Sequence, residues 1–135
     1  MNEEKIHQYG DELYEAFLSR RPIRPLLERE PDITIADAYR IQERFVARRV
    51  AAGEKVIGKK IGATSKPVQD FLGVYQPDFG ILLSGMVYNE GDTLDLGRLI
   101  QPKAEAELAF VLKEDLKGPG ITAMDVIRAT DYVLP

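Results

Sequence analysis

The chain has 135 residues, with 18 lysines and arginines against 22 aspartates and glutamates, so its formal net charge at pH 7 is −4. This charge repels phosphate backbones and excludes the class of strongly basic nucleic-acid-binding proteins. Cysteine is absent and His7 is the single histidine, which excludes disulfides, thiolate metal sites and histidine-rich zinc sites. Any chemistry must therefore use lysine, carboxylate, tyrosine and hydroxyl side chains.

Hydrophobic residues make up 44% of the chain and charged residues 30%, which is typical of a globular protein with one core. The acidic N-terminus lacks the basic and then apolar pattern of a signal peptide, and no apolar run approaches the roughly 20 residues of a membrane helix. We therefore expect a cytoplasmic protein with neither a nucleic-acid nor a membrane partner.

The N-terminal part of the chain carries helical patterns. Apolar residues recur at spacings of three and four over residues 3–19, which predicts a first helix. Thr34 and Asp37 form a capping-box pattern, which predicts the start of a second helix that ends before Gly53. Between the two helices, the three prolines of residues 20–31 indicate a surface connection.

Beyond Gly53 the patterns favour strands and turns. Residues 56–62 form a short segment with β-branched side chains, bounded by glycine, which predicts a strand that enters a tight turn. Ser65 is placed to cap a short helix that Gly73 stops. From residue 76 onward we expect turns alternating with strands, so that the second half of the chain is mostly sheet.

The longest predicted strand is Lys103–Leu112. A helix is also compatible with this segment, but Pro102 precedes it and its acidic and apolar residues alternate with period two, which favours a strand. Thr122 and Asp125 repeat the capping pattern and predict a last helix. Residues 131–135 are typical of the approach to a further buried strand, so we expect a truncated chain.

Two carboxylates in the predicted strand are candidate metal ligands. On a strand, Glu105 and Glu107 project from the same face with Cα atoms about 6.6 Å apart. If that face is buried, the pair must be protonated, paired with cations or bound to a metal, and oxygen ligands select Mg²⁺, Mn²⁺ or Ca²⁺. The alternative is that both acids lie on the solvent face of an edge strand, near Lys103 or Lys113.

Two further residues could carry acid–base chemistry. Lys60 stands between the strand at 56–62 and a turn of small residues, where it could bind a substrate carboxylate or transfer protons. It could equally be a solvated lysine like its neighbour Lys59. Asp78 could be a general acid or base, although an aspartate between proline and Phe-Gly is also typical of a turn.

Taken together and in this order, these segments resemble the hydratase/decarboxylase family of the fumarylacetoacetate hydrolase superfamily. The resemblance covers nearly the whole chain and implies an α+β fold: a helical N-terminal segment over residues 1–54, followed by the first part of a mixed β-roll over residues 55–135. The matching stretches are Asp37-Ala38-Tyr39-Arg40-Ile41-Gln42, residues 58–66 (GKKIGATSK), residues 72–80 (LGVYQPDFG) and residues 99–110 (LIQPKAEAELAF).

The resemblance also implies an activity. It is that of a metal-dependent lyase, which adds water to 2-hydroxypenta-2,4-dienoate to give 4-hydroxy-2-oxopentanoate in aromatic meta-cleavage catabolism. Mg²⁺ or Mn²⁺ would be held by three carboxylates, of which Glu105 and Glu107 match the first two and the third lies beyond Pro135. The catalytic residues would be Lys60 and Asp78, and the substrate carboxylate would be bound by Thr64 and Ser65.

Other functions stay open at this point. The related decarboxylase activity would form the same metal enolate from 4-oxalocrotonate (2-oxo-3-hexenedioate) by loss of CO₂. A non-catalytic fragment of either enzyme, or a small carboxylate-binding module without chemistry, is also compatible with the residues. The resemblance further implies a homo-oligomer and association with the pathway decarboxylase or aldolase.

Overall fold

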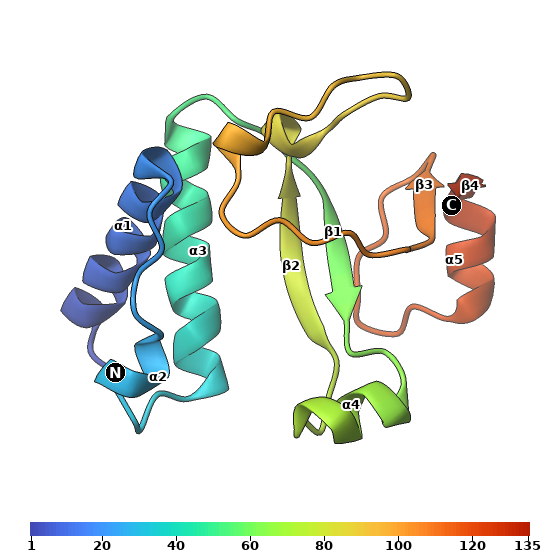
Figure 1. The fold of residues 1–135 in the computed structure, drawn as a ribbon. Coiled ribbons are helices and arrows are strands. Elements are labelled where there is room, and N and C mark those ends of the chain that lie inside the picture. Colours follow the sequence, from blue (N-terminus) through green and yellow to red (C-terminus); the bar gives the residue numbers. More distant parts are fainter. The chain divides into compact units, whose positions relative to one another are not determined.

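The computed structural model describes all residues, 1–135, and mixes helices with strands (Figure 1). The chain divides into two compact units, residues 1–100 and 101–135, which are described separately below. The predicted domain boundary between residues 54 and 55 falls within the first unit, and as a statement about domains it stays a prediction. The elements in chain order are α1 (Glu3–Ser19), α2 (Leu26–Arg29), α3 (Ile35–Ala51), β1 (Val56–Gly62), α4 (Lys66–Leu72), β2 (Asp78–Leu83), β3 (Ala109–Leu112), α5 (Ala123–Ala129) and β4 (Thr130–Leu134).

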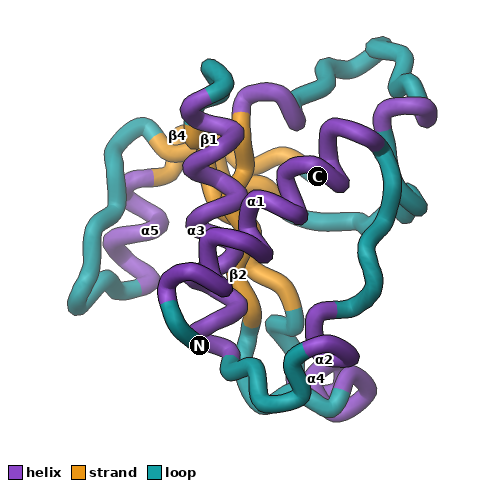
Figure 2. The backbone as a smooth tube through the Cα atoms, turned by 90° about the vertical axis from the view of Figure 1, so that its left-hand side faces the viewer, coloured by secondary structure: helices purple, strands orange, loops and turns teal.

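The first unit begins with α1 and α3, which lie side by side in both views of the backbone (Figures 1 and 2). Their apolar stripes meet in a small core of Ile6, Tyr9 and Ile41. The predicted capping box is confirmed, because the Thr34 hydroxyl accepts from the Asp37 N–H at 3.1 Å and the Asp37 carboxylate accepts from the Thr34 N–H at 3.2 Å. These caps satisfy backbone N–H groups that the first turn leaves without helical partners.

The antiparallel hairpin β1–β2 follows the helices. The predicted strand over residues 56–62 is confirmed, and its ladder ends where Gly62 pairs with Asp78. Leu83, at the other end of β2, is fully buried. Gly73 ends α4 with a left-handed backbone (φ 69°), as expected of a glycine C-cap.

Some predictions for the first unit were wrong. Residues 20–31 are not only a connection, because α2 forms one helical turn there. Asp78 is the first residue of β2 instead of a turn residue, because its backbone pairs with Gly62. The stretch 84–108 carries no strand and only two short 3₁₀ turns, Ser84–Met86 and Leu96–Arg98, so the second half of the chain is not mostly sheet.

The second unit contains the antiparallel pair β3–β4 and helix α5. The predicted capping box of the last helix is confirmed, with the Thr122 hydroxyl accepting from the Asp125 N–H at 3.3 Å. A strand does follow that helix, but β4 is largely exposed instead of buried. Both sheets of the chain have two strands, and the mixed β-roll stays a prediction.

The predicted strand Lys103–Leu112 was wrong over most of its length, since only Ala109–Leu112 is a strand. The register explains the difference. The pairs with β4 run only from Ala109–Leu134 to Leu112–Thr130, so residues 103–108 have no partner in this ladder. Without a partner strand, the alternating pattern alone does not produce an extended ladder.

None of the helices is both long enough and apolar enough to cross a membrane.

Candidate active site

Lys60 and Asp78 project from the same face of the β1–β2 hairpin. In the ladder, Lys60 pairs with Gly80 and Gly62 pairs with Asp78, two positions further along. Residues that face each other across an antiparallel ladder share a face, and so do residues two apart on one strand. The two candidate catalytic side chains are therefore diagonal neighbours on this face. Each lies opposite a glycine of the other strand: Lys60 opposite Gly80, and Asp78 opposite Gly62.

The two glycines make room for the charged side chains. A Cβ atom on Gly62 would overlap the Oδ1 atom of Asp78 and lie 3.1 Å from its Cγ. A Cβ atom on Gly80 would lie 2.8 Å from the Cγ of Lys60. The carboxylate and the lysine stem thus lie flat over the backbone of the paired strand. Lys60 and Asp78 are both exposed, so a small molecule could reach this face.

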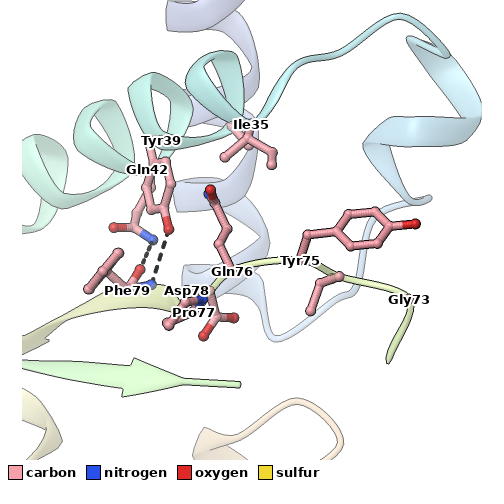
Figure 3. A pocket seen from close by; sticks show the side chains of 11 residues that line it. Ile35, Tyr39, Gln42, Gly73, Tyr75, Gln76, Pro77, Asp78 and Phe79 are labelled. Carbon is pink, nitrogen blue, oxygen red and sulfur yellow. Dashed lines mark hydrogen bonds between the residues drawn. The ribbon is translucent and has the colours of Figure 1, made fainter. Parts of the chain in front are cut away.

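Two side chains of α3 hold the backbone next to Asp78 (Figure 3). The Phe79 N–H donates to the Tyr39 hydroxyl at 3.1 Å, and the Gln42 Nε2 donates to the Phe79 carbonyl at 3.2 Å. The rings of Tyr39 and Phe79 also pack together, with centroids 6.4 Å apart. Because Phe79 and Asp78 are adjacent on a strand, their side chains leave opposite faces, and α3 packs on the face opposite Asp78.

A pocket of about 560 Å³ lies beside these contacts, between the first half of α3 and the segment that leads into β2. Figure 3 shows the Gln76 side chain extending toward Ile35, while the ring of Tyr75 points away from the other labelled side chains. The helix contributes Ile35, Ala38, Tyr39 and Gln42 to its lining, and the incoming segment contributes residues 73–79.

The predicted substrate-binding hydroxyls lie in the turn after β1. Thr64 and Ser65 are exposed, and Ser65 stands at the N-cap position of α4 without making a capping hydrogen bond through its side chain. The turn is tight, since Ala63 has a left-handed backbone (φ 51°). The Gln69 Nε2 donates to the Ala63 carbonyl at 2.8 Å and fixes the turn on the helix.

Glu105 and Glu107 lie in the second unit, in a segment that is neither helix nor strand. Both are exposed, so the argument that a shared strand face draws them into the interior does not hold in this structure. Their donor chemistry nevertheless fits a hard divalent cation, because Mg²⁺ is commonly bound by one or two carboxylates and completed by water or substrate. No group of three or more aspartate, glutamate, histidine or cysteine side chains forms a metal site.

Sequence reasoning missed the roles of Tyr39 and Gln42. A signal was present, because residues three apart on a helix lie on the same side, here the side that reaches β2. It also missed that Gly62 and Gly80 stand opposite the two candidate catalytic residues, since this requires the register of the hairpin.

Curated relatives match the chain over its whole length. It is 54% identical over 136 residues to "2-hydroxypent-2,4-dienoate hydratase" of Pseudomonas putida, covering 100% of this chain and 61% of that protein. It is 52% identical over 132 residues to "2-hydroxyhexa-2,4-dienoate hydratase" of Comamonas testosteroni, covering 96% of this chain and 50% of that protein. The chain thus spans about half the length of the curated relatives it matches. No family model matches it.

Two solved structures have the same fold over this length. They are "4-oxalocrotonate decarboxylase from Pseudomonas putida G7" complexed with magnesium and adipate (TM-score 0.91, 35% identity) and with calcium and acetate (TM-score 0.93, 36% identity). These matches cover 98% and 100% of this chain and 51% and 52% of those chains. In sequence and fold the chain is thus similar to these dienoate hydratases and oxalocrotonate decarboxylases, about half of whose length it spans.

Proposed function

We propose that the protein is a hydro-lyase that adds water to 2-hydroxypenta-2,4-dienoate to give 4-hydroxy-2-oxopentanoate. The observation that carries this proposal is the 54% identity over the whole chain to a relative with that substrate in its name. The shared face of Lys60 and Asp78 supports it, because the reaction needs a group that moves protons beside a group that stabilises an enolate.

The reaction assigns a task to each side chain. The proton of the 2-hydroxyl group must leave and C5 must gain one, which turns the dienol into a conjugated 2-keto acid. Water then adds its hydroxyl group to C4 and a proton to C3. We assign these proton transfers to Asp78 and the stabilisation of the oxygen on C2 to Lys60.

The substrate carboxylate is assigned to the turn after β1. The hydroxyls of Thr64 and Ser65 are exposed there and can donate to an anion, and the Gln69 side chain holds the turn in place. This binding orients the conjugated chain toward Lys60, which stands in the strand that leads into this turn.

Glu105 and Glu107 are assigned to a divalent cation. Mg²⁺ or Mn²⁺ suits their carboxylates, and such a cation would supply Lewis-acid chemistry. The magnesium and calcium in the complexes of the decarboxylase support a divalent ion in this family. A homo-oligomer, and association with the pathway decarboxylase or aldolase, stay predictions.

Activity measurements test this proposal. With Mg²⁺ present, the purified protein should consume the dienoate, and Lys60→Ala and Asp78→Asn should lower kcat by about 100-fold or more, the range of acid–base contributions. Lys59→Ala, on the opposite face of β1, and Asp70→Asn, on α4, are matched controls that should stay within about twofold of the parent. Absence of turnover with retained binding of a substrate analogue would favour a carboxylate-binding module, and absence of both would favour a non-catalytic fragment.

A calorimetric titration tests the metal assignment separately. Glu105→Gln and Glu107→Gln should each weaken Mg²⁺ binding at least about tenfold, in the range seen when metal-site groups are removed. Glu114→Gln, exposed just after β3, is the matched control. Equal Mg²⁺ affinity in all three variants would contradict the assignment.

Decarboxylation of 4-oxalocrotonate is the second candidate, because two solved structures that match the chain are decarboxylases. The discriminating measurement is CO₂ release from that substrate against water addition to the dienoate, with the same protein and metal. Faster turnover of the dicarboxylate would reverse the order of the two candidates.

A further inference from the structure

We propose that Tyr39 and Gln42 are positioning residues for the proton transfers at Asp78. They act through the backbone of Phe79, which they hold from α3. This inference rests on the proposed function, since it takes Asp78 as the residue that moves protons.

The two hydrogen bonds hold the two peptides that flank Phe79. Tyr39 accepts from the N–H of the Asp78–Phe79 peptide, and Gln42 donates to the carbonyl of the Phe79–Gly80 peptide. In an antiparallel ladder, alternate residues direct both backbone polar groups toward the partner strand, and the residues between direct theirs away. Phe79 directs its N–H and carbonyl to Tyr39 and Gln42, so Asp78 and Gly80 direct theirs toward β1. The plane of the peptide that follows Asp78 is therefore fixed, and this plane sets the direction in which the Asp78 side chain leaves the strand.

The support is needed because Asp78 stands at an end of the hairpin. The ladder stops at the Gly62–Asp78 pair, and residues 73–76 before it are exposed. The residue immediately before Asp78 is Pro77, which has no N–H to donate. Strand ends of this kind open locally at low cost in free energy unless other contacts hold them.

The helix that provides the support is itself fixed. Its capping box at Thr34 orders the first turn of α3, and Ile41 is buried in the core against α1. Tyr39 and Gln42 are three residues apart and reach the same backbone segment, as Figure 3 shows. The contact thus connects a well-packed helix to the weakly held end of β2.

The experiment compares Tyr39→Phe and Gln42→Leu with the controls Tyr14→Phe and Gln8→Leu on α1. Each Tyr39 and Gln42 variant should lower kcat by about tenfold with KM within about twofold, because a misplaced catalytic group slows the reaction more than it weakens binding. Amide hydrogen exchange by NMR should show faster exchange at Phe79 in Tyr39→Phe while the amides of α3 stay protected. The controls should match the parent protein in both measurements.

Combination with Asp78→Asn separates the possible outcomes. If Tyr39 acts through Asp78, Tyr39→Phe should cause no further loss of kcat in an Asp78→Asn background, whereas an independent structural effect would multiply the losses. Full activity of Asp78→Asn would overturn the proposed function. The positioning role alone would be overturned by a different result. Asp78→Asn would lose activity, while Tyr39→Phe and Gln42→Leu would keep the kcat of the parent and its rate of amide exchange at Phe79.

Discussion

Asp78 lies opposite Gly62 in the hairpin ladder, and its carboxylate occupies the space that a side chain at Gly62 would fill. Gly62 and Gly80 do not have the left-handed backbone that ordinarily explains a glycine, unlike Gly53 and Gly73. Their role is to leave space for Asp78 and Lys60. The face of the hairpin that carries the candidate catalytic residues therefore depends on two positions without side chains.

Gly62→Ala should displace the Asp78 carboxylate, because the new methyl group would overlap Oδ1. We expect kcat of the proposed hydratase to fall on the order of 10- to 100-fold, as for other small misplacements of a catalytic group. Gly58→Ala is the matched control on the same strand and face, since its Cβ would lie 3.6 Å from Leu82 in ordinary contact. Steady-state kinetics check the pair, and equal losses in both variants would show that the effect is general strand destabilisation.

Breaking the ion pair between the buried Arg49 and the half-buried Glu54 should destabilise the first unit. Arg49 is 3% exposed, donates to Glu54 at 2.6 and 2.7 Å, and has its guanidinium 4.2 Å from the Phe17 ring centroid. Glu54→Ala leaves this cation buried without its partner, and should lower the free energy of unfolding by about 3 kcal/mol. Urea denaturation measures the change, with the exposed Glu43→Ala on α3 as control; a loss below about 1 kcal/mol would contradict the argument.

The acid stability of the helical pair should depend on Asp37. The Thr34 hydroxyl, together with the amino group of Met1 at 3.0 Å, holds the pKa of Asp37 at about 2, below its usual 3.8. Because the unfolded chain takes up this proton first, the stabilisation is complete above the usual pKa and is lost as the pH falls toward 2.

Circular dichroism during an acid titration checks this dependence. Asp37→Asn should be less stable than the parent at neutral pH and should lose less stability between pH values of about 4 and 2, where the parent carboxylate is protonated. Asp32→Asn, exposed in the preceding turn, is the control. Identical acid profiles for Asp37→Asn and the parent would show that this carboxylate does not set the acid limit.

The 135-residue chain expressed by itself should associate through its apolar surface. Phe71 is 88% exposed and Tyr75 is 91% exposed, both at or after the end of α4. Burying such side chains is favourable by about 1.5–3 kcal/mol each, so contacts between copies are expected. Sedimentation velocity should show oligomers that decrease in the Phe71→Ser/Tyr75→Ser variant, and a monomer at all concentrations would contradict this prediction.

The amino-acid sequence by itself determined the three longer-patterned helices and their caps. Helices α1, α3 and α5, and the capping boxes of α3 and α5, were predicted because caps and apolar stripes involve residues three or four apart, whose interactions form wherever the chain turns into a helix. Lys60 and Asp78 could be selected as candidates from their residue types and neighbours. Their roles, like those of Thr64, Ser65, Glu105 and Glu107, stay predictions.

The tertiary structure decided which distant residues meet. The register of β1–β2 places Lys60 and Asp78 on one face over two glycines, and the packing of α3 brings Tyr39 and Gln42 to Phe79. It also decided the length of β3, which the alternating pattern overestimated. A strand exists only where another strand supplies hydrogen-bond partners, and no local pattern contains that partner.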